Sequence, residues 1–306
     1  MQEGSRRAVV AALAANLGIA AANFVAFAVT GATALLAEAI HSVADSGNEA
    51  ILGFGGVRAQ RAPTAEHPFG FGRERYFFAF VVALVLFSLG SLFAIYQGAT
   101  KLAHLEPVDQ PAVGFVVLGV ALVLESLSIR TASRAANAVR GEQGWWTFIR
   151  TTKAPELPVV LLEDFGGIVG LLLAAVGLGL TVATGDPSYD AAASIAIGVL
   201  LGVIAMLLAV ETKSLLIGEA ASPSDEADIR SAIVNGPEVE RLIHLRTQHL
   251  GPEELLVAAK IDLTAGAEPD TARAIDRIEA RIRARVPHAR VIYLEPDVYR
   301  SDATGS

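Results

Sequence analysis

Cysteine is absent from the 306 residues, and tryptophan and methionine occur only twice each. Without cysteine the chain forms no disulfide, holds no metal through thiolates and contains no cysteine nucleophile. Any metal ion must therefore be bound through histidine nitrogen and carboxylate oxygen. Charged residues are also scarce, at 18% of the chain, and the net charge of −8 gives no indication of nucleic-acid binding.

Apolar residues are correspondingly abundant. They make up 53% of the chain, and the mean hydropathy of +0.48 is too high for an ordinary soluble domain. Six apolar segments are long enough to cross the hydrocarbon core of a bilayer as helices, which takes about 20 residues. They lie near residues 9–30, 33–56, 77–100, 112–133, 157–183 and 188–210. The sequence therefore predicts a multi-pass, α-helical integral membrane protein with six transmembrane helices.

The basic residues between these segments indicate their orientation. Arginines precede the first segment, and further arginines and lysines lie at 58–75 and 130–153, whereas the opposite connections hold only Lys101. Positively charged residues favour the cytoplasmic side of a membrane. We therefore expect both termini to be cytoplasmic, with the cell (inner) membrane as the location.

The last third of the chain has a different pattern. Serines at 222 and 224 and acids after them predict the start of a helix that ends at Gly236. Strands are predicted at 239–251, 254–263 and 289–296, and an amphipathic helix at 268–286. We place Ala272, Ile275, Ile278, Ile282 and Val286 on the apolar side of this helix. The order αββαβ predicts a ferredoxin-like α+β domain, so residues 1–211 are expected to form the transmembrane domain and residues 212–306 a cytoplasmic domain.

The stretch "AEAIHSVADSGNEA", residues 37–50, places ionisable side chains inside the second apolar segment. Glu38, His41 and Asp45 are spaced i, i+3 and i+7, so they share one helix face, and Asn48 continues it. Charge buried in a membrane is costly and is by default a functional site. His41 and Asp45 can offer a ring nitrogen and a carboxylate to one divalent cation. A polar contact between helices is the alternative.

A second pair of acids lies in the fifth segment. Glu163 and Asp164 are adjacent and are followed by Gly166 and Gly167, which permit close helix approach. Neighbouring residues of a helix project about 100° apart, so we expect Asp164 to be the metal ligand and Glu163 to support it or to act as a fourth ligand. Together with His41 and Asp45 this donor set suits zinc. Manganese, iron, cobalt and cadmium remain open.

Three other polar residues lie within apolar segments. Glu125, in the fourth segment, is either a residue of a proton path or the partner of an arginine or hydroxyl. Asn16 and Asn23, in the first segment, are expected to form hydrogen bonds between helices.

The stretch "ALLAEAIHSVADSGNEAILGFG", the loop "EHPFGFGRERYFFAF", "SYDAAASIAIGVLLG" and the last third of the chain together resemble the cation diffusion facilitators. This is a family of zinc transporters and related metal/proton antiporters. The segments "HPFGFGRERYF", "LVLESLSIRTA" and "LLEDFGG" resemble in particular its zinc transporter 9-like branch. The resemblance implies that His41 and Asp45 are metal ligands and that the cytoplasmic domain forms a homodimer.

The chain departs from the family pattern at several positions. Val160 lies four residues before Asp164, where the family has a histidine, and Phe71 replaces a loop histidine. The family positions for cytoplasmic metal ligands fall on Ile243, Ala259 and Tyr293, which are poor ligands. We therefore expect the cytoplasmic domain to dimerise without binding metal.

The sequence thus predicts a secondary transporter rather than an enzyme. It would export a divalent metal, zinc first, from the cytoplasm in exchange for protons, by alternating access at a central site between the second and fifth helices. Its partners would be metal, protons, lipid and a second copy of itself, with no resident cofactor and no nucleic acid. The alternatives are a transport-dead, metal-responsive membrane protein and an intramembrane metalloenzyme, for which the sequence has no His-Glu-x-x-His motif.

Overall fold

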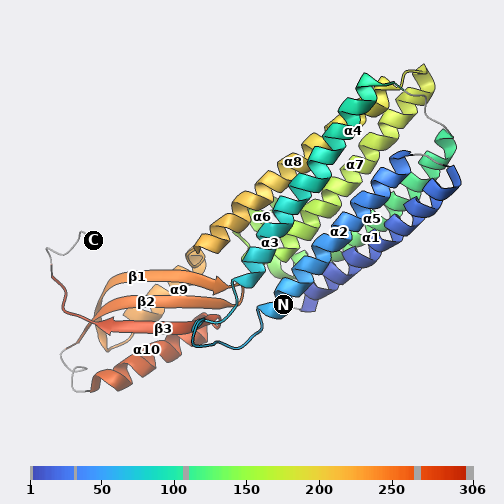
Figure 1. Cartoon of the computed structure of the whole chain (residues 1–306). Coiled ribbons are helices and arrows are strands. Elements are labelled where there is room, and N and C mark those ends of the chain that lie inside the picture. Colours follow the sequence, from blue (N-terminus) through green and yellow to red (C-terminus); the bar gives the residue numbers. More distant parts are fainter. Residues whose placement is uncertain (1–2, 31–32, 106–109, 265–269, 301–306) are drawn as a thin grey trace. The chain divides into compact units, whose positions relative to one another are not determined.

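The computed structural model describes residues 3–30, 33–105, 110–264 and 270–300 (Figure 1). Within these ranges, the side chains of residues 3–8, 26–27, 29–30, 33–38, 40–41 and 86–88 lie outside the description. The chain divides into two compact units. The first comprises Met1–Gln60 and Glu74–Lys213, and the second comprises Arg61–Arg73 and Ser214–Ser306. The predicted division of roles between residues 1–211 and 212–306 stays a prediction.

The first unit is entirely helical in its described part. Its helices are α1 Glu3–Thr30, α2 Thr33–Arg58, α3 Glu74–Val85, a π-helical turn η1 Leu86–Ser91, α4 Leu92–Ala103, α5 Pro111–Arg140, α6 Trp145–Thr151, α7 Glu156–Thr184 and α8 Ser188–Ile217. Each predicted apolar segment coincides with one long helix, the third running from α3 through α4. Within the described residues, four helices are long and apolar enough to cross a membrane: Glu74–Ala103, α5, α7 and α8. Helix α1 adds a shorter apolar stretch, Val9–Val25.

The long helices lie side by side (Figure 1). Helix α1 packs against α2 and α5, α5 packs against α7, and α2 packs against α3. Near the N-terminal ends of α3 and α7, Arg75 and Glu156 form a buried ion pair in which Arg75 Nη2 donates to Glu156 Oε2 at 2.8 Å. Removal of either side chain would leave the other charge buried without a partner, which is strongly destabilising.

Glycines allow α4 and α8 to approach closely. A Cβ atom on Gly98 would lie 2.8 Å from the Ala191 carbonyl oxygen, and a Cβ on Gly198 would lie 2.8 Å from the Ser91 carbonyl oxygen. Ser91, the last residue of the π-helical turn, donates from its Oγ to the Gly198 carbonyl at 2.7 Å. Small residues at helix contacts are the usual means of packing in membranes, where lipid removes the hydrophobic driving force.

The second unit contains α9 Pro223–Val234, β1 Val239–Gly251, β2 Glu254–Leu263, α10 Thr271–Arg285 and β3 Ala289–Pro296, which confirms the predicted αββαβ order. The sheet order is β1-β2-β3, with β1 and β2 antiparallel and β2 and β3 parallel. Every second residue of β2 is buried, from Leu255 to Leu263. These side chains form one core with apolar residues of α9 and α10, because successive side chains of a strand point to opposite faces.

The two helices of this unit follow the predicted signals with one correction. Ser222 is the N-cap of α9, and its Oγ accepts a hydrogen bond from the Asp225 backbone N–H at 3.1 Å. In α10, Ile278 and Ile282 are buried as predicted, but Ala272 is exposed and Ala274 is buried in its place. Residues 274, 278 and 282 follow one another at intervals of four and therefore share a face.

The loop between α2 and α3 belongs to the second unit. A Cβ atom on Gly72 would lie 2.7 Å from the Leu250 carbonyl oxygen, so this part of the loop packs directly on the end of β1. The His67 ring stacks on Phe71 with 4.7 Å between centroids. Only a glycine fits at residue 72 without moving the strand or the loop.

Candidate metal centre

Helix α2 carries a row of buried polar side chains on the face predicted from the sequence. Ser42, Asp45, Asn48 and Glu49 are all buried within the helical unit. Residues three or four apart lie on one side of a helix, which places this row toward the neighbouring helices. Two predicted members, Glu38 and His41, lie on α2 but their side chains are outside the described residues.

The two adjacent acids of α7 are both buried and turn to different helices. Asp164 accepts hydrogen bonds from Ser128 Oγ of α5, at 3.1 Å to Oδ1 and 3.0 Å to Oδ2. Glu163 Oε1 accepts a hydrogen bond from Asn48 Nδ2 of α2 at 2.9 Å. The divergence of about 100° expected for neighbouring residues therefore brings each carboxylate to its own polar partner, instead of leaving one of them in lipid.

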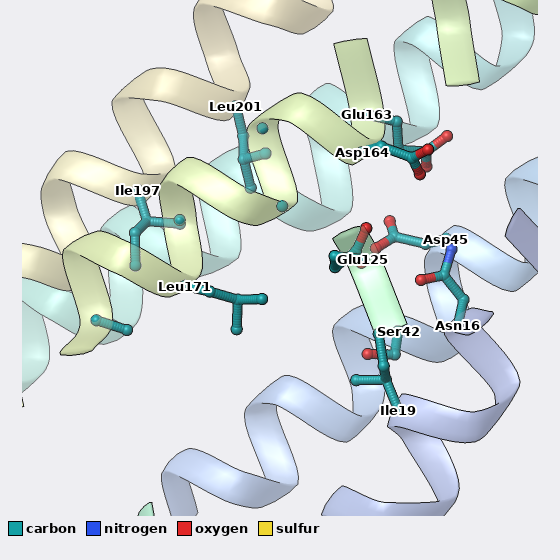
Figure 2. A pocket seen from close by; sticks show the side chains of 14 residues that line it. Asn16, Ile19, Ser42, Asp45, Glu125, Glu163, Asp164, Leu171, Ile197 and Leu201 are labelled. Carbon is teal, nitrogen blue, oxygen red and sulfur yellow. The ribbon is translucent and has the colours of Figure 1, made fainter. Parts of the chain in front are cut away.

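A cavity lies between these helices (Figure 2). Its polar lining comes from α1, α2, α5 and α7 and consists of Asn16, Ser42, Asp45, Glu125, Glu163 and Asp164. Apolar residues line the rest, with Ile19, Leu171, Ile197 and Leu201 labelled in Figure 2. The cavity has a volume of about 50 Å³, against the roughly 10–15 Å³ that one water molecule needs. It has room for an ion with some of its water.

The structure brings three of the four predicted site residues to this cavity. Asp45, Glu163 and Asp164 direct their carboxylates to the same region from α2 and α7 (Figure 2). His41, the fourth, is outside the described side chains. Among the side chains that are described, no three histidine, aspartate or glutamate residues are placed to hold a metal by themselves. A complete ligand set from Asp45 and Asp164 would therefore include His41, amide or hydroxyl oxygens, or water.

Glu125 of α5 lines the cavity as well, and its role in a proton path or as the partner of an arginine or hydroxyl stays a prediction. Its carboxylate lies against α7, since a Cβ atom on Gly167 would be 3.1 Å from Glu125 Cδ and 3.2 Å from Oε1. The absence of a side chain at Gly167 therefore leaves the space that the Glu125 carboxylate occupies. Carboxylates from three helices, α2, α5 and α7, line one cavity.

Sequence reasoning missed Glu49, which is fully buried and accepts a hydrogen bond from Asn16 Nδ2 at 3.0 Å. The signal was present, since Glu49 lies four residues after Asp45 and so continues the row. The interhelical hydrogen bond expected for Asn16 is confirmed by this contact. Asn23 is also buried, but its amide has no hydrogen-bond partner among the described residues.

The family follows from comparison with known proteins. A family model described as the cation efflux transmembrane domain matches residues 9–217. The chain belongs to the cation efflux family. As a member of the cation efflux family, which comprises the cation diffusion facilitators, it is an integral membrane protein with the predicted fold class, and the family is one of transporters rather than enzymes.

Two relatives, one human and one from a plant, agree with the predicted branch, and a bacterial relative matches over most of both chains. The human protein named proton-coupled zinc antiporter SLC30A9, mitochondrial, is 28% identical over 242 residues, which cover 78% of this chain and 43% of that protein. Metal tolerance protein C4 of Arabidopsis thaliana is 31% identical over 260 residues, covering 84% and 57%. Cation-efflux pump FieF of Klebsiella pneumoniae is 25% identical over 290 residues, covering 94% and 90%. This cation efflux protein thus spans about half the length of the human and plant relatives.

Proposed function

We propose that the protein exports a divalent metal cation, zinc first, in exchange for protons. The central site lies between α2 and α7 and uses His41, Asp45 and Asp164, with Glu163 beside them. The observation that carries this proposal is that Asp45 and Asp164, from two helices far apart in the sequence, line the same buried cavity. Membership of the cation efflux family and the zinc antiporter among the relatives support it.

Exchange with protons follows from the chemistry of the ligands. Imidazole nitrogen and carboxylate oxygen bind either a proton or a metal with the same lone pairs, so metal binding releases protons. Acid on one side of the membrane would therefore eject the metal, and metal on the other side would displace the protons. The close glycine contacts of α8 with α4 and α7 permit these helices to move against one another and expose the site alternately.

The ligand types support zinc without excluding other metals. Zinc binds histidine nitrogen and carboxylate oxygen in four-coordinate sites. Helix α7 contains no histidine, since Val160 stands at the position where the family has one. His41 is therefore the one nitrogen ligand of the proposed set. Manganese, iron, cobalt and cadmium are the competing substrates.

Transport into everted membrane vesicles tests the proposal. Asp45→Asn and Asp164→Asn each remove one anionic ligand and should reduce proton-driven uptake of zinc to background, with the variants still extracted as folded protein. Glu163→Gln should have a smaller effect on zinc. His41→Asp should lower zinc uptake more than manganese or cadmium uptake, because it replaces the nitrogen ligand. A smaller pH difference across the vesicle membrane should slow zinc uptake by the wild type.

The control is Glu211→Gln, which removes an acid of α8 that pairs with Arg150 at 3.1 Å, outside the cavity lining. Uptake should remain at the wild-type level. Wild-type rates for both Asp45→Asn and Asp164→Asn would remove the central site from the mechanism. Zinc binding without uptake in the wild type would favour a transport-dead, metal-responsive membrane protein.

The remaining parts of the proposal concern the assembly. We infer that the protein is a homodimer in the cell (inner) membrane with both termini in the cytoplasm. The family resemblance supports a dimer. Of the family's cytoplasmic ligand positions, Ala259 is a core residue and Tyr293 is exposed, which supports dimerisation without metal in this unit.

A further inference from the structure

A second polar cluster lies beside the cavity, between α1, α2 and α7. It consists of Glu49 and Asn48 of α2, Glu163 of α7 and Asn16 of α1. Asn16 and Glu163 also line the cavity, whereas Asn48 and Glu49 are not part of that lining. Glu49 is 0% exposed, Asn48 1% and Glu163 6%, so the cluster is buried, with Asn48 and Glu49 outside the cavity lining.

Each acid of this cluster has one oxygen satisfied and one oxygen without a partner. Asn16 Nδ2 donates to Glu49 Oε1 at 3.0 Å, and Asn48 Nδ2 donates to Glu163 Oε1 at 2.9 Å. Glu49 Oε2, Glu163 Oε2 and Asn48 Oδ1 are buried and have no hydrogen-bond partner among the described residues. Three acceptor atoms therefore lie in the interior with no donor to meet them.

The cluster also lacks a counter-charge within the described part of the chain. The ion pairs of the helical unit use other acids: Glu74, Glu156, Asp190 and Glu211. Asn48, which donates to Glu163, is the residue next to Glu49 on α2, so the two glutamates are linked through this helix. Two unpaired carboxylates in a membrane interior cost several kcal/mol, as does each buried acceptor left without a donor.

We propose that Glu49, Glu163 and Asn48 form a second cation site, distinct from the central site at Asp45 and Asp164. A divalent cation would neutralise both carboxylates and meet all three unpartnered oxygens at once. The donors are oxygen only, which favours hard cations such as manganese over zinc. Asn16 positions Glu49 for this site. The inference deepens the proposed function, because Glu163 then serves the second site while Asp164 serves the central one.

The two sites share their helices. Glu49 lies one helical turn after Asp45 on α2, and Glu163 precedes Asp164 on α7, so each helix contributes one acid to each site. A cation that leaves the central site toward the N-terminal end of α7 meets the second site next.

Counting bound manganese by electron paramagnetic resonance tests the proposal on the full chain in lipid nanodiscs. The wild type should bind two Mn²⁺ ions per chain, with spin–spin broadening from their proximity. Asp45→Asn combined with Asp164→Asn should bind one ion and lose the broadening. Glu49→Gln should also bind one ion, since Gln keeps the size of Glu and an oxygen for Asn16. The variant that combines Asp45→Asn, Asp164→Asn and Glu49→Gln should bind no Mn²⁺ ion. The control Glu211→Gln should bind two.

Two results would overturn the second site. One is an unchanged Mn²⁺ count in Glu49→Gln. The other is proton release altered in Glu49→Gln while the wild type binds a single ion, which would mean that the cluster holds protons only. Glu49→Asp, which keeps the charge on a shorter side chain, should weaken binding of the second ion at least tenfold. The ion that Glu49→Gln keeps at the central site checks that its loss of the second ion is not loss of folding. The loss of an ion in Glu49→Gln is independent of the transport assay, since wild-type uptake by Asp45→Asn and Asp164→Asn would remove the proposed function and leave the ion at Glu49 in place.

Discussion

At the scale of single residues, the candidate metal centre depends on neutral side chains as much as on acids. Ser128 donates to both oxygens of Asp164, and Asn48 donates to Glu163. Such hydrogen bonds fix the direction in which a carboxylate offers its free lone pairs. The acids alone would therefore give an incomplete description of the site.

Ser128→Ala should weaken metal binding at the central site. Loss of the hydroxyl leaves Asp164 free to rotate, and loss of such a supporting partner typically lowers metal affinity by about 10–100-fold. Zinc affinity of the full chain, measured by competition with a fluorescent chelator, checks this expectation. Ser126→Ala is a matched control on the same helix, because Ser126 Oγ donates only to the Leu122 carbonyl, at 2.6 Å on an exposed face. Equal affinities for the two variants would contradict a supporting role for Ser128.

Glu238 in the second unit links stability to pH. Burial alone would raise its pKa, but hydrogen bonds from Arg277, at 2.5 Å, and from Arg281 outweigh burial, and the pKa lies below its ordinary value. A carboxylate with a depressed pKa contributes stability at neutral pH, and this contribution is lost as pH falls through the folded-state pKa.

The second unit should therefore lose stability as the pH falls below about 4.5, the ordinary pKa of Glu. Glu238→Gln should be less stable than the wild type at pH 7 and depend less on pH in this window. Amide hydrogen exchange of β1 and β2 in the full chain, corrected for the intrinsic effect of pH, measures both effects. Glu240→Gln, at a neighbouring exposed position, should follow the wild type; a parallel loss in that variant would point to general charge rather than to the arginine contacts.

At the scale of elements, the contact between α4 and α8 has almost no tolerance. In Gly198→Ala the new methyl group would lie 2.8 Å from both the Ser91 carbonyl oxygen and the Ile95 backbone nitrogen. Backbone atoms cannot rotate away as a side chain can, so the helices must separate. Overpacking of this kind costs about 1–3 kcal/mol, and we expect a lower melting temperature in detergent. Gly119→Ala on α5, where nothing lies within 4 Å, should melt at the wild-type temperature or above it.

The elements themselves could be predicted because their signals are local. The length of the apolar segments predicted the long helices, the alternation of apolar and polar residues predicted the strands, and Ser222 marked the start of α9. The partners of the acids could not be predicted, because Asn48–Glu163 and Ser128–Asp164 join residues that are distant in the sequence. Glu49 was missed although it continues the row of Asp45, because its burial against Asn16 of α1 depends on a contact between residues distant in the sequence. The π-helical turn at Leu86–Ser91 has no local signal in its residues either.

At the scale of the whole molecule, the absence of cysteine allows the predicted topology to be tested directly. Single cysteines introduced as Glu142→Cys, just beyond α5, and Asp186→Cys, between α7 and α8, replace exposed side chains on opposite sides of the predicted membrane domain. A membrane-impermeant maleimide applied to intact cells should label Asp186→Cys and spare Glu142→Cys. Labelling of Glu142→Cys from outside would reverse the orientation, and with it the direction of export.

The loop at Arg61–Arg73 sets an order of events during synthesis. This loop is made between α2 and α3, yet Gly72 packs on Leu250 and Gly251. At ~5–20 residues per second a ribosome needs roughly 10 to 40 s to extend the chain from residue 72 to residue 251. The flanking helices therefore enter the membrane while the loop still waits for its strand. A chain released before β1 is complete would contain the acids of α2 and α7, but the loop between α2 and α3 would lack the strand on which Gly72 packs.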